Sequence, residues 1–212
     1  MTEHDTRILL SELGASLFTR GFSVGSAGNI SVRLPDGYLM TPTNSSLGRL
    51  DPDRLSKLDP AFQHIGGDKP SKEVFMHRAF YQARPEAGAV VHLHSTHATA
   101  VSCLPDVEAS NPIPPLTPYF VMRVGRHMPI VPYYRPGDPA MELAINTAAQ
   151  DARAVLLANH GPVISGKTLT DAVYAAEELE EAAKLFLMLH SQGRPPRLLT
   201  DPQVDDLLAT FQ

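Results

Sequence analysis

The sequence contains no tryptophan, a single cysteine and no long hydrophobic run. Cys103 has no partner for a disulfide within the chain, which favours a reducing compartment. No uninterrupted apolar stretch is longer than residues 154–158, far short of the ~20 residues that a membrane-spanning helix needs. The first residues, MTEHDTR, lack the basic start and apolar core of a secretory signal. We therefore expect a cytoplasmic protein with no membrane partner.

An excess of positive charge is also missing. The 212 residues include 18 Lys and Arg against 23 Asp and Glu, a formal net charge of −5. No basic patch or run is visible, so we expect no nucleic-acid partner. A run of glutamates over residues 177–181 is typical of the solvated face of a helix. Length and an apolar content of 43% fit one domain over residues 1–212, with a C-terminal tail helix within 195–212.

The pattern of apolar residues predicts both helices and strands. Helical spacing and alternating spacing occur in different segments, separated by proline and glycine. Because the two kinds of element alternate irregularly, we expect an α/β fold with a mixed or antiparallel sheet. The predicted helices are 5–20, 71–84 with Ser71 as N-cap, 96–104, 138–151, 168–190 and 201–211. The predicted strands are 30–34, 38–41, 56–59, 89–94, 130–134, 154–158 and 163–164.

Histidines are plentiful, at nine in the chain, and two of them stand in a predicted strand. Residues two apart in a strand point to the same face, so His92 and His94 project together while Leu93 points into the core. Two imidazoles placed in this way can bind one metal ion. A hydrogen-bonded or surface pair of histidines is the alternative interpretation.

A third histidine follows another buried strand. In Leu157-Ala158-Asn159-His160-Gly161, the histidine stands where the strand ends, and active sites collect at such places. Three histidines with an open fourth position form a catalytic rather than a structural metal arrangement. His97 competes with His160 for the third place. The other five histidines are expected to be surface or packing residues.

Loops rich in small polar residues, 25–29 and 41–46, are candidates for binding an anion. The predicted helix start at Ser71 offers free backbone amides, which bind phosphate in many proteins, and Glu73 would lie in its first turn. Lys72 occupies a position that is unfavourable for a cation near a helix N-terminus. The unfavourable position therefore indicates that Lys72 has a functional role, in which it binds the phosphate or the carboxylate of a substrate. Ordinary turns are the alternative for both loops.

In order along the chain, several motifs together resemble the class II aldolase/adducin family. They are A-G-N-I-S at 27–31, T-P-T-N at 41–44, P-S-K-E at 70–73, H-L-H-S at 92–95 and N-H-G at 159–161. The resemblance implies a three-layer α/β/α fold with a central, largely antiparallel sheet. It also implies a homotetramer with active sites at the subunit interfaces.

The resemblance implies roles for individual residues. It makes His92, His94 and His160 the ligands of a Zn²⁺ ion, and such ligands also accept Mn²⁺, Co²⁺ or Ni²⁺. It makes Glu73 the catalytic acid/base. Tyr119 falls near a tyrosine that the aldolases present to a neighbouring subunit's site. The positions that hold substrate phosphate in the family are Asn29, Thr43, Asn44, Ser71 and Lys72.

Departures from the aldolases point to another branch of the family. This chain has Lys72 where they have serine and Asn44 where they have glycine, and residues 195–212 contain no tyrosine. The longer strings G-D-K-P-S-K-E, V-V-H-L-H-S-T-H and V-P-Y-Y-R-P-G-D-P resemble a branch that decarboxylates 3-oxo-tetronate 4-phosphate. That reaction yields dihydroxyacetone phosphate and CO₂ through a metal-stabilised enediolate, in the breakdown of four-carbon sugar acids.

Three alternatives remain open from the sequence. Aldolase or 4-epimerase activity on fuculose or ribulose phosphates uses the same kind of intermediate. An adducin-like interaction module uses the same fold without chemistry, and loss of the metal ligands would mark it. An unrelated metallohydrolase would need a general base beside a metal-bound water.

Overall fold

The computed structural model describes residues 2–135, 138–193 and 195–211, and in this part of the chain eight strands form one sheet. The strand order is β4-β3-β2-β1-β5-β8-β7-β6. All neighbouring strands are antiparallel except β6 and β7, which are parallel. The largely antiparallel sheet predicted from the family resemblance is thus confirmed. The strands are β1 Asn29–Leu34, β2 Gly37–Met40, β3 Ser56–Leu58, β4 His64–Gly66, β5 Ala89–His92, β6 Ile130–Val131, β7 Ala154–Leu157 and β8 Gly161–Gly166.

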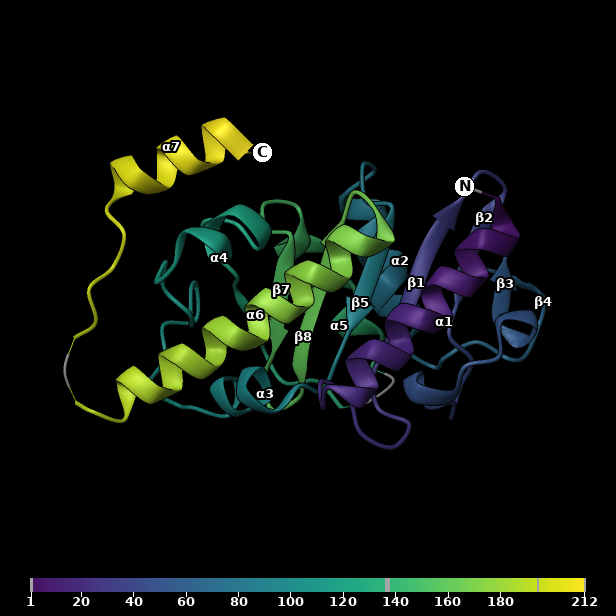
Figure 1. Ribbon diagram of the computed structural model, residues 1–212, viewed down its shortest axis with the longest axis horizontal. Helices are drawn as coiled ribbons and strands as arrows, with labels where there is room; N and C mark the ends of the chain where they lie inside the picture. The colour runs from purple at the N-terminus through teal and green to yellow at the C-terminus, as the bar shows by residue number, and fades with distance from the viewer. Residues whose placement is uncertain (1, 136–137, 194, 212) are drawn as a thin grey trace.

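Helices cover both faces of the sheet and produce three layers (Figure 1). The helices α1 (Glu3–Thr19) and α6 (Leu169–His190) cross the near face in Figure 1, with α3 (Thr96–Ser102) and α4 (Pro118–Arg123) packed against α6. On the far face, α2 (Val74–Ala83) packs against α5 (Pro139–Ala149). The last helix, α7 (Asp201–Phe211), packs on α4. Two 3-10 turns, Leu47–Arg49 and Pro52–Arg54, interrupt the segment between β2 and β3.

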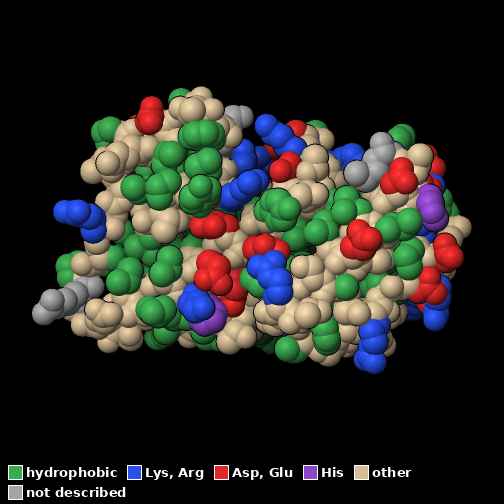
Figure 2. Space-filling view, in the orientation of Figure 1, with side chains coloured by type: hydrophobic (Ala, Val, Ile, Leu, Met, Phe, Trp, Pro, Cys, Tyr) green, Lys and Arg blue, Asp and Glu red, His purple; other side chains and the backbone are tan. Residues whose placement is uncertain are grey.

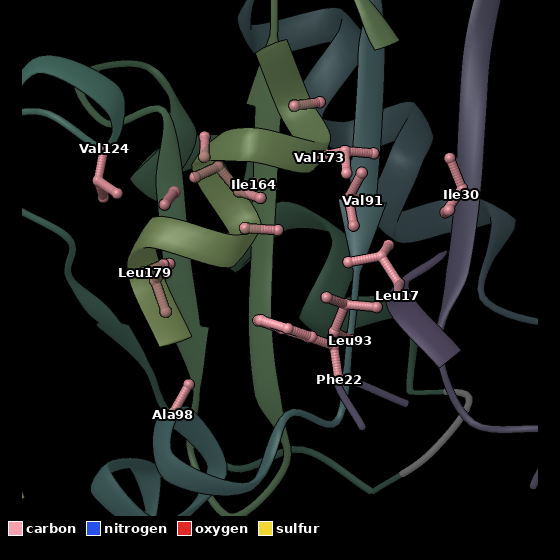
Figure 3. Packing of buried hydrophobic residues seen from close by; sticks show 14 of the residues in the cluster. Leu17, Phe22, Ile30, Val91, Leu93, Ala98, Val124, Ile164, Val173 and Leu179 are labelled. Atoms are coloured by element: carbon pink, nitrogen blue, oxygen red, sulfur yellow. The ribbon is translucent and has the colours of Figure 1, made fainter. Parts of the chain in front are cut away.

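Alternation along the central strands divides the apolar side chains between two cores. Val91 and Leu93 of the β5 segment face the α1–α6 side, where they pack with Leu17, Ile164 and Leu179 (Figure 3). Val90 faces the other side and belongs to the core beneath α2 and α5. His92 shares that second side, so the strand period directs its side chain toward α2.

Several element boundaries differ from the sequence predictions, and two of these differences lie at the ends of elements that carry or adjoin His92, His94 and Glu73. Ser71 is not the N-cap of α2: its hydroxyl accepts a hydrogen bond from the backbone amide of Glu73 at 3.2 Å, and the helix begins at Val74 with Glu73 as N-cap. Strand β5 ends at His92, so His94 lies beyond the strand that was predicted to carry it. The short helix α4 was not predicted, because prolines at 112, 114, 115 and 118 indicated an irregular connection.

The acidic run on α6 is only partly solvated, which corrects the prediction for one of its members. Glu180 is 7% exposed, and its carboxylate accepts hydrogen bonds from the backbone amides of His97 and Ala98 at the start of α3. Glu177 pairs instead with Arg20. On this face of the molecule, acidic and basic side chains are interspersed with apolar ones (Figure 2). Among the described helices, none combines the length and apolar character needed to span a membrane.

Candidate metal-binding active site

Three segments that are distant in the sequence meet where the central strand β5 ends and its neighbours β1 and β8 begin. His92 is the last residue of β5, and the antiparallel register places it opposite Asn29 of β1 and Val163 of β8. His160 lies in the tight turn between β7 and β8, directly before Gly161. Glu73 lies at the start of α2, on the same side of the sheet. The register of the three neighbouring strands therefore positions the cluster.

Close backbone packing around the histidine segment requires glycine. Gly161 has a φ of +154°, and a Cβ atom there would lie 2.4 Å from the carbonyl oxygen of Leu93. Gly28, with a φ of +77°, would place a Cβ atom 2.9 Å from the carbonyl oxygen of His92. Both positions favour glycine on conformational grounds as well. The glycines in the A-G-N and N-H-G motifs thus let two loops close on the histidine-bearing segment.

The side chains of His92, His94, His160 and Glu73 converge. The Nε2 atom of His94 lies 3.1 Å from Nε2 of His92 and 3.1 Å from Nε2 of His160. The Glu73 carboxylate oxygens lie 3.7 Å from Nε2 of His92 and 3.6 Å from Nε2 of His160. One ligand atom from each of the four residues lies within 4.8 Å of all the others. Nitrogens bound at about 2.0–2.1 Å to one tetrahedral ion are roughly 3.3 Å apart, which matches the histidine spacing.

The donor set fits a divalent cation. The Nδ1 atom of His92 lies 2.9 Å from the carbonyl oxygen of Pro162, so Nδ1–H donates to that carbonyl and the Nε2 lone pair faces the cluster. Burial lowers the pKa of His92 to about 4 and also lowers the pKa values of His94 and His160. Neutral imidazoles with lone pairs directed at one point repel one another, and a cation removes that repulsion.

Glu73 is held by a buried amide. Its Oε2 atom accepts a hydrogen bond of 2.6 Å from Nδ2 of Asn29, which is 4% exposed. Burial raises the pKa of Glu73, but the adjacent imidazoles, His92 foremost, and the Asn29 amide lower it further. The net direction of the pKa shift is down. Glu73 is therefore ionised at neutral pH in the metal-free protein.

The cluster opens into a cavity of about 630 Å³. All five residues predicted to hold phosphate line it: Asn29, Thr43, Asn44, Ser71 and Lys72. Asn44 has a φ of +56°, a left-handed conformation that asparagine and glycine adopt most readily. Asn44 therefore suits the backbone conformation of this loop.

Two residues considered from the sequence, Tyr119 and His97, lie away from the cavity, and two tyrosines that were not considered line it. Tyr119 on α4 is 64% exposed and does not line the cavity of its own chain, so its predicted contribution to a neighbouring site stays a prediction. His97 donates from its ring and its backbone to Glu180, away from the cluster. Tyr133 and Tyr134 line the cavity and were not predicted as site residues. The sequence signal for both was the Y-Y of the 131–139 motif, of which Pro136 and Gly137 lie outside the described residues.

The fold and this cluster define an α/β protein with a candidate three-histidine metal site beneath a cavity lined by both polar and apolar residues. Residues 9–187 match the model of the class II aldolase and adducin N-terminal domain, and the chain belongs to that family.

Relatives in the family cover nearly the whole chain. The 3-oxo-tetronate 4-phosphate decarboxylase of Haemophilus influenzae is 52% identical over 208 residues, 98% of both chains. The L-fuculose phosphate aldolase of the same organism is 35% identical and covers 90% of this chain and 86% of its own. The crystal structure of YgbL from Klebsiella pneumoniae superposes with a TM-score of 0.93 at 49% identity, covering 98% of this chain and 99% of that one.

Proposed function

We propose that this protein is a lyase that decarboxylates 3-oxo-tetronate 4-phosphate to dihydroxyacetone phosphate and CO₂. The observation that carries the proposal is the three-histidine cluster with Glu73 at the floor of a cavity that Lys72 also lines. The high identity to decarboxylases over nearly the full length supports this substrate above those of the aldolases. The presence of all the predicted ligands argues against an adducin-like module without chemistry.

A divalent metal ion, Zn²⁺ in our proposal, would be held by His92, His94 and His160, with Glu73 as a further ligand when no substrate is bound. Mn²⁺, Co²⁺ or Ni²⁺ would also suit imidazole ligands. When bound, the ion supplies a Lewis acid that stabilises the negative charge developing on the ketone oxygen.

The residues of the chain provide binding, orientation and proton transfer. Thr43, Asn44 and Ser71 present small polar groups to the phosphate at the cavity wall, remote from the bond that breaks, and this orients the substrate. Lys72 is exposed and, among the described residues, forms no ion pair, so its charge is available to the substrate. Glu73 delivers a proton to the carbon whose bond to CO₂ breaks and is then reprotonated from solvent, so that one solvent proton is consumed for each CO₂ released.

The proposed activity is tested by mixing metal-loaded protein with 3-oxo-tetronate 4-phosphate, generated in situ by phosphorylating the oxo acid. We expect CO₂ and dihydroxyacetone phosphate to appear in equal amounts, and chelation to abolish both. Release of an aldehyde from fuculose or ribulose phosphates, without CO₂ from the oxo acid, would contradict the proposal and place the protein among the aldolases.

Lys72→Ala is expected to raise KM at least tenfold, equivalent to about 1.4 kcal/mol, because Lys72 is the one lysine or arginine among the described residues that line the cavity. Steady-state kinetics of the decarboxylation measure the change. Lys69→Ala is the matched control, since Lys69 is exposed three residues away and does not line the cavity. Unchanged kinetics in Lys72→Ala would reject a substrate-binding role for this lysine.

We also propose a homotetramer in which Tyr119 completes the site of a neighbouring subunit. Support comes from its position: a tyrosine that is 64% exposed on α4 and remote from its own cavity is available to another chain. Light scattering coupled to size exclusion is expected to give four times the chain mass of 23.0 kDa. Tyr119→Phe is expected to lower kcat without changing that mass. A monomer that is fully active would refute both statements.

A further inference from the structure

We propose that His77 is a positioning residue that sets the orientation of the Asn29 amide and, through it, the place of the Glu73 carboxylate. The inference rests on the acid/base role proposed for Glu73. His77 has no counterpart among the motifs that define the site, and it does not line the cavity. His77 is 0% exposed, on the buried face of α2.

A continuous chain of hydrogen bonds joins His77 to Glu73. His77 Nε2 lies 2.5 Å from Oδ1 of Asn29, and Nδ2 of Asn29 lies 2.6 Å from Oε2 of Glu73. On the other side, His77 Nδ1 lies 2.7 Å from Oγ of Ser31, whose oxygen lies 2.9 Å from the hydroxyl of Tyr81. All of these atoms lie between α2 and the sheet.

The local structure explains why these residues meet. Glu73, His77 and Tyr81 are spaced four residues apart at the start of α2 and along it, so they lie on one face of the helix. Asn29 and Ser31 are two apart in β1 and therefore face the same side of the sheet. The helix face and the strand face pack against each other, and their polar side chains form the chain of hydrogen bonds.

The hydrogen bonds have one consistent direction. Glu73 is a carboxylate, so the Asn29 group beside it is the NH₂ end and the group beside His77 is the carbonyl oxygen. His77 must then donate from Nε2, which leaves Nδ1 as an acceptor for the Ser31 hydroxyl. Ser31 in turn accepts from the Tyr81 hydroxyl. Every donor points toward Glu73, and aligned hydrogen bonds of this kind polarise one another.

His77 stays neutral in this environment, as that direction requires. Burial, with a smaller contribution from His92, lowers the pKa of His77 to about 3. Of the other groups around the chain, Tyr81 has its pKa raised by burial, and the Arg33 guanidinium lies over its ring at 4.8 Å. A neutral, single tautomer of His77 offers only a donor to Asn29, so the amide cannot reverse without losing a buried hydrogen bond.

Asn29 therefore contacts Glu73 in addition to lining the cavity, where the family resemblance implies a phosphate-binding role for it. Without His77, the Asn29 carbonyl has no donor and the amide is free to rotate. The carboxylate oxygen would then face a carbonyl oxygen for part of the time and would shift away. Displacement of a catalytic group by about 1 Å can cost up to roughly 100-fold in rate.

The test compares His77→Phe, which removes both ring nitrogens and keeps a planar ring, with His77→Gln, whose amide can donate to Asn29. We expect His77→Phe to lower kcat by about 10- to 100-fold with KM changed less than threefold, and His77→Gln to recover most of the loss. Ser31→Ala, a smaller change in the same chain, is expected to lower kcat by about threefold. Tyr38→Phe, a buried tyrosine beside Tyr81 but outside the chain of hydrogen bonds, is the control with unchanged kcat.

Two readouts separate this inference from the proposed function. Exchange of a dihydroxyacetone phosphate proton with D₂O requires Glu73 whether the enzyme is a decarboxylase or an aldolase, and we expect His77→Phe to slow it as it slows kcat. A crystal structure of His77→Phe is expected to show the Asn29–Glu73 contact broken. Wild-type exchange without CO₂ release would overturn the proposed function alone. An intact contact, an unchanged kcat, or a His77→Gln variant no better than His77→Phe would overturn the role of His77.

Discussion

His92→Ala is expected to abolish metal binding and activity together. His92 is 0% exposed, and the hydrogen bond from its Nδ1–H to the Pro162 carbonyl fixes the direction of its Nε2 atom before any ion arrives. Loss of an outer partner of a metal ligand already costs about 10- to 100-fold in affinity, so loss of a preoriented ligand costs more. Metal analysis of the purified protein and the decarboxylation assay measure the two effects.

The control for this variant is His97→Ala. His97 is the nearest alternative ligand in the sequence, yet its ring contacts Glu180 and does not face the cluster. We expect His97→Ala to retain its metal and its kcat, although it loses one contact at the start of α3. Full metal occupancy in His92→Ala would contradict the assignment of the cluster. Thermal unfolding with and without added Zn²⁺ separates metal loss from misfolding, because a ligand that binds only the folded state raises Tm.

Most of the strands near the site could be predicted because their signals are local. The hairpin of β1 and β2 follows from alternation around Pro35-Asp36-Gly37, and β7 follows from its short run of buried aliphatic residues. Two histidines spaced for a strand face were enough to predict that His92 and His94 converge. The two side chains do converge even though β5 ends at His92, because the backbone amide of Leu93 still donates to the Pro162 carbonyl of β8 at 3.3 Å.

Other features depended on contacts that no local pattern encodes. The role of a histidine depends on which groups its ring contacts in the folded chain. The ring of His77 contacts Asn29, that of His92 contacts the Pro162 carbonyl, and that of His97 contacts Glu180. Glu180 was predicted to be solvated because its neighbours on α6 are acidic. Its burial depends on the N-terminal amides of α3, which lie about eighty residues earlier in the sequence.

The role of Asn29 shows the same limit at the site itself. The family resemblance placed it with the phosphate-binding residues, and it does line the cavity. Its amide nevertheless contacts Glu73 on one side and His77 on the other. The register of β1 against β5, which sets Asn29 opposite His92, brings it to the carboxylate. Strand register arises from the whole sheet, so a single motif does not reveal it.

Glu73→Gln is expected to lower kcat by about 10²- to 10⁴-fold while KM and the bound metal change little. The glutamine side chain has the same shape and retains an oxygen that accepts the hydrogen bond from Nδ2 of Asn29, so the local structure is preserved. It cannot accept and return a proton. The electron pair left on the carbon after CO₂ departs then has no acid in contact with it.

The stereochemistry of protonation at that carbon tests the role of Glu73 more directly than the rate does. In D₂O, the wild-type protein is expected to deliver one deuteron from one face and to produce a single stereoisomer of monodeuterated dihydroxyacetone phosphate. With Glu73→Gln, protonation has to come from water, and we expect a slower reaction whose product carries the label on both faces. NMR of the derivatised product distinguishes these outcomes. A stereospecific product from Glu73→Gln would show that another group delivers the proton, and Tyr119 of a neighbouring subunit would become the candidate, since it is exposed and remote from the cavity of its own chain.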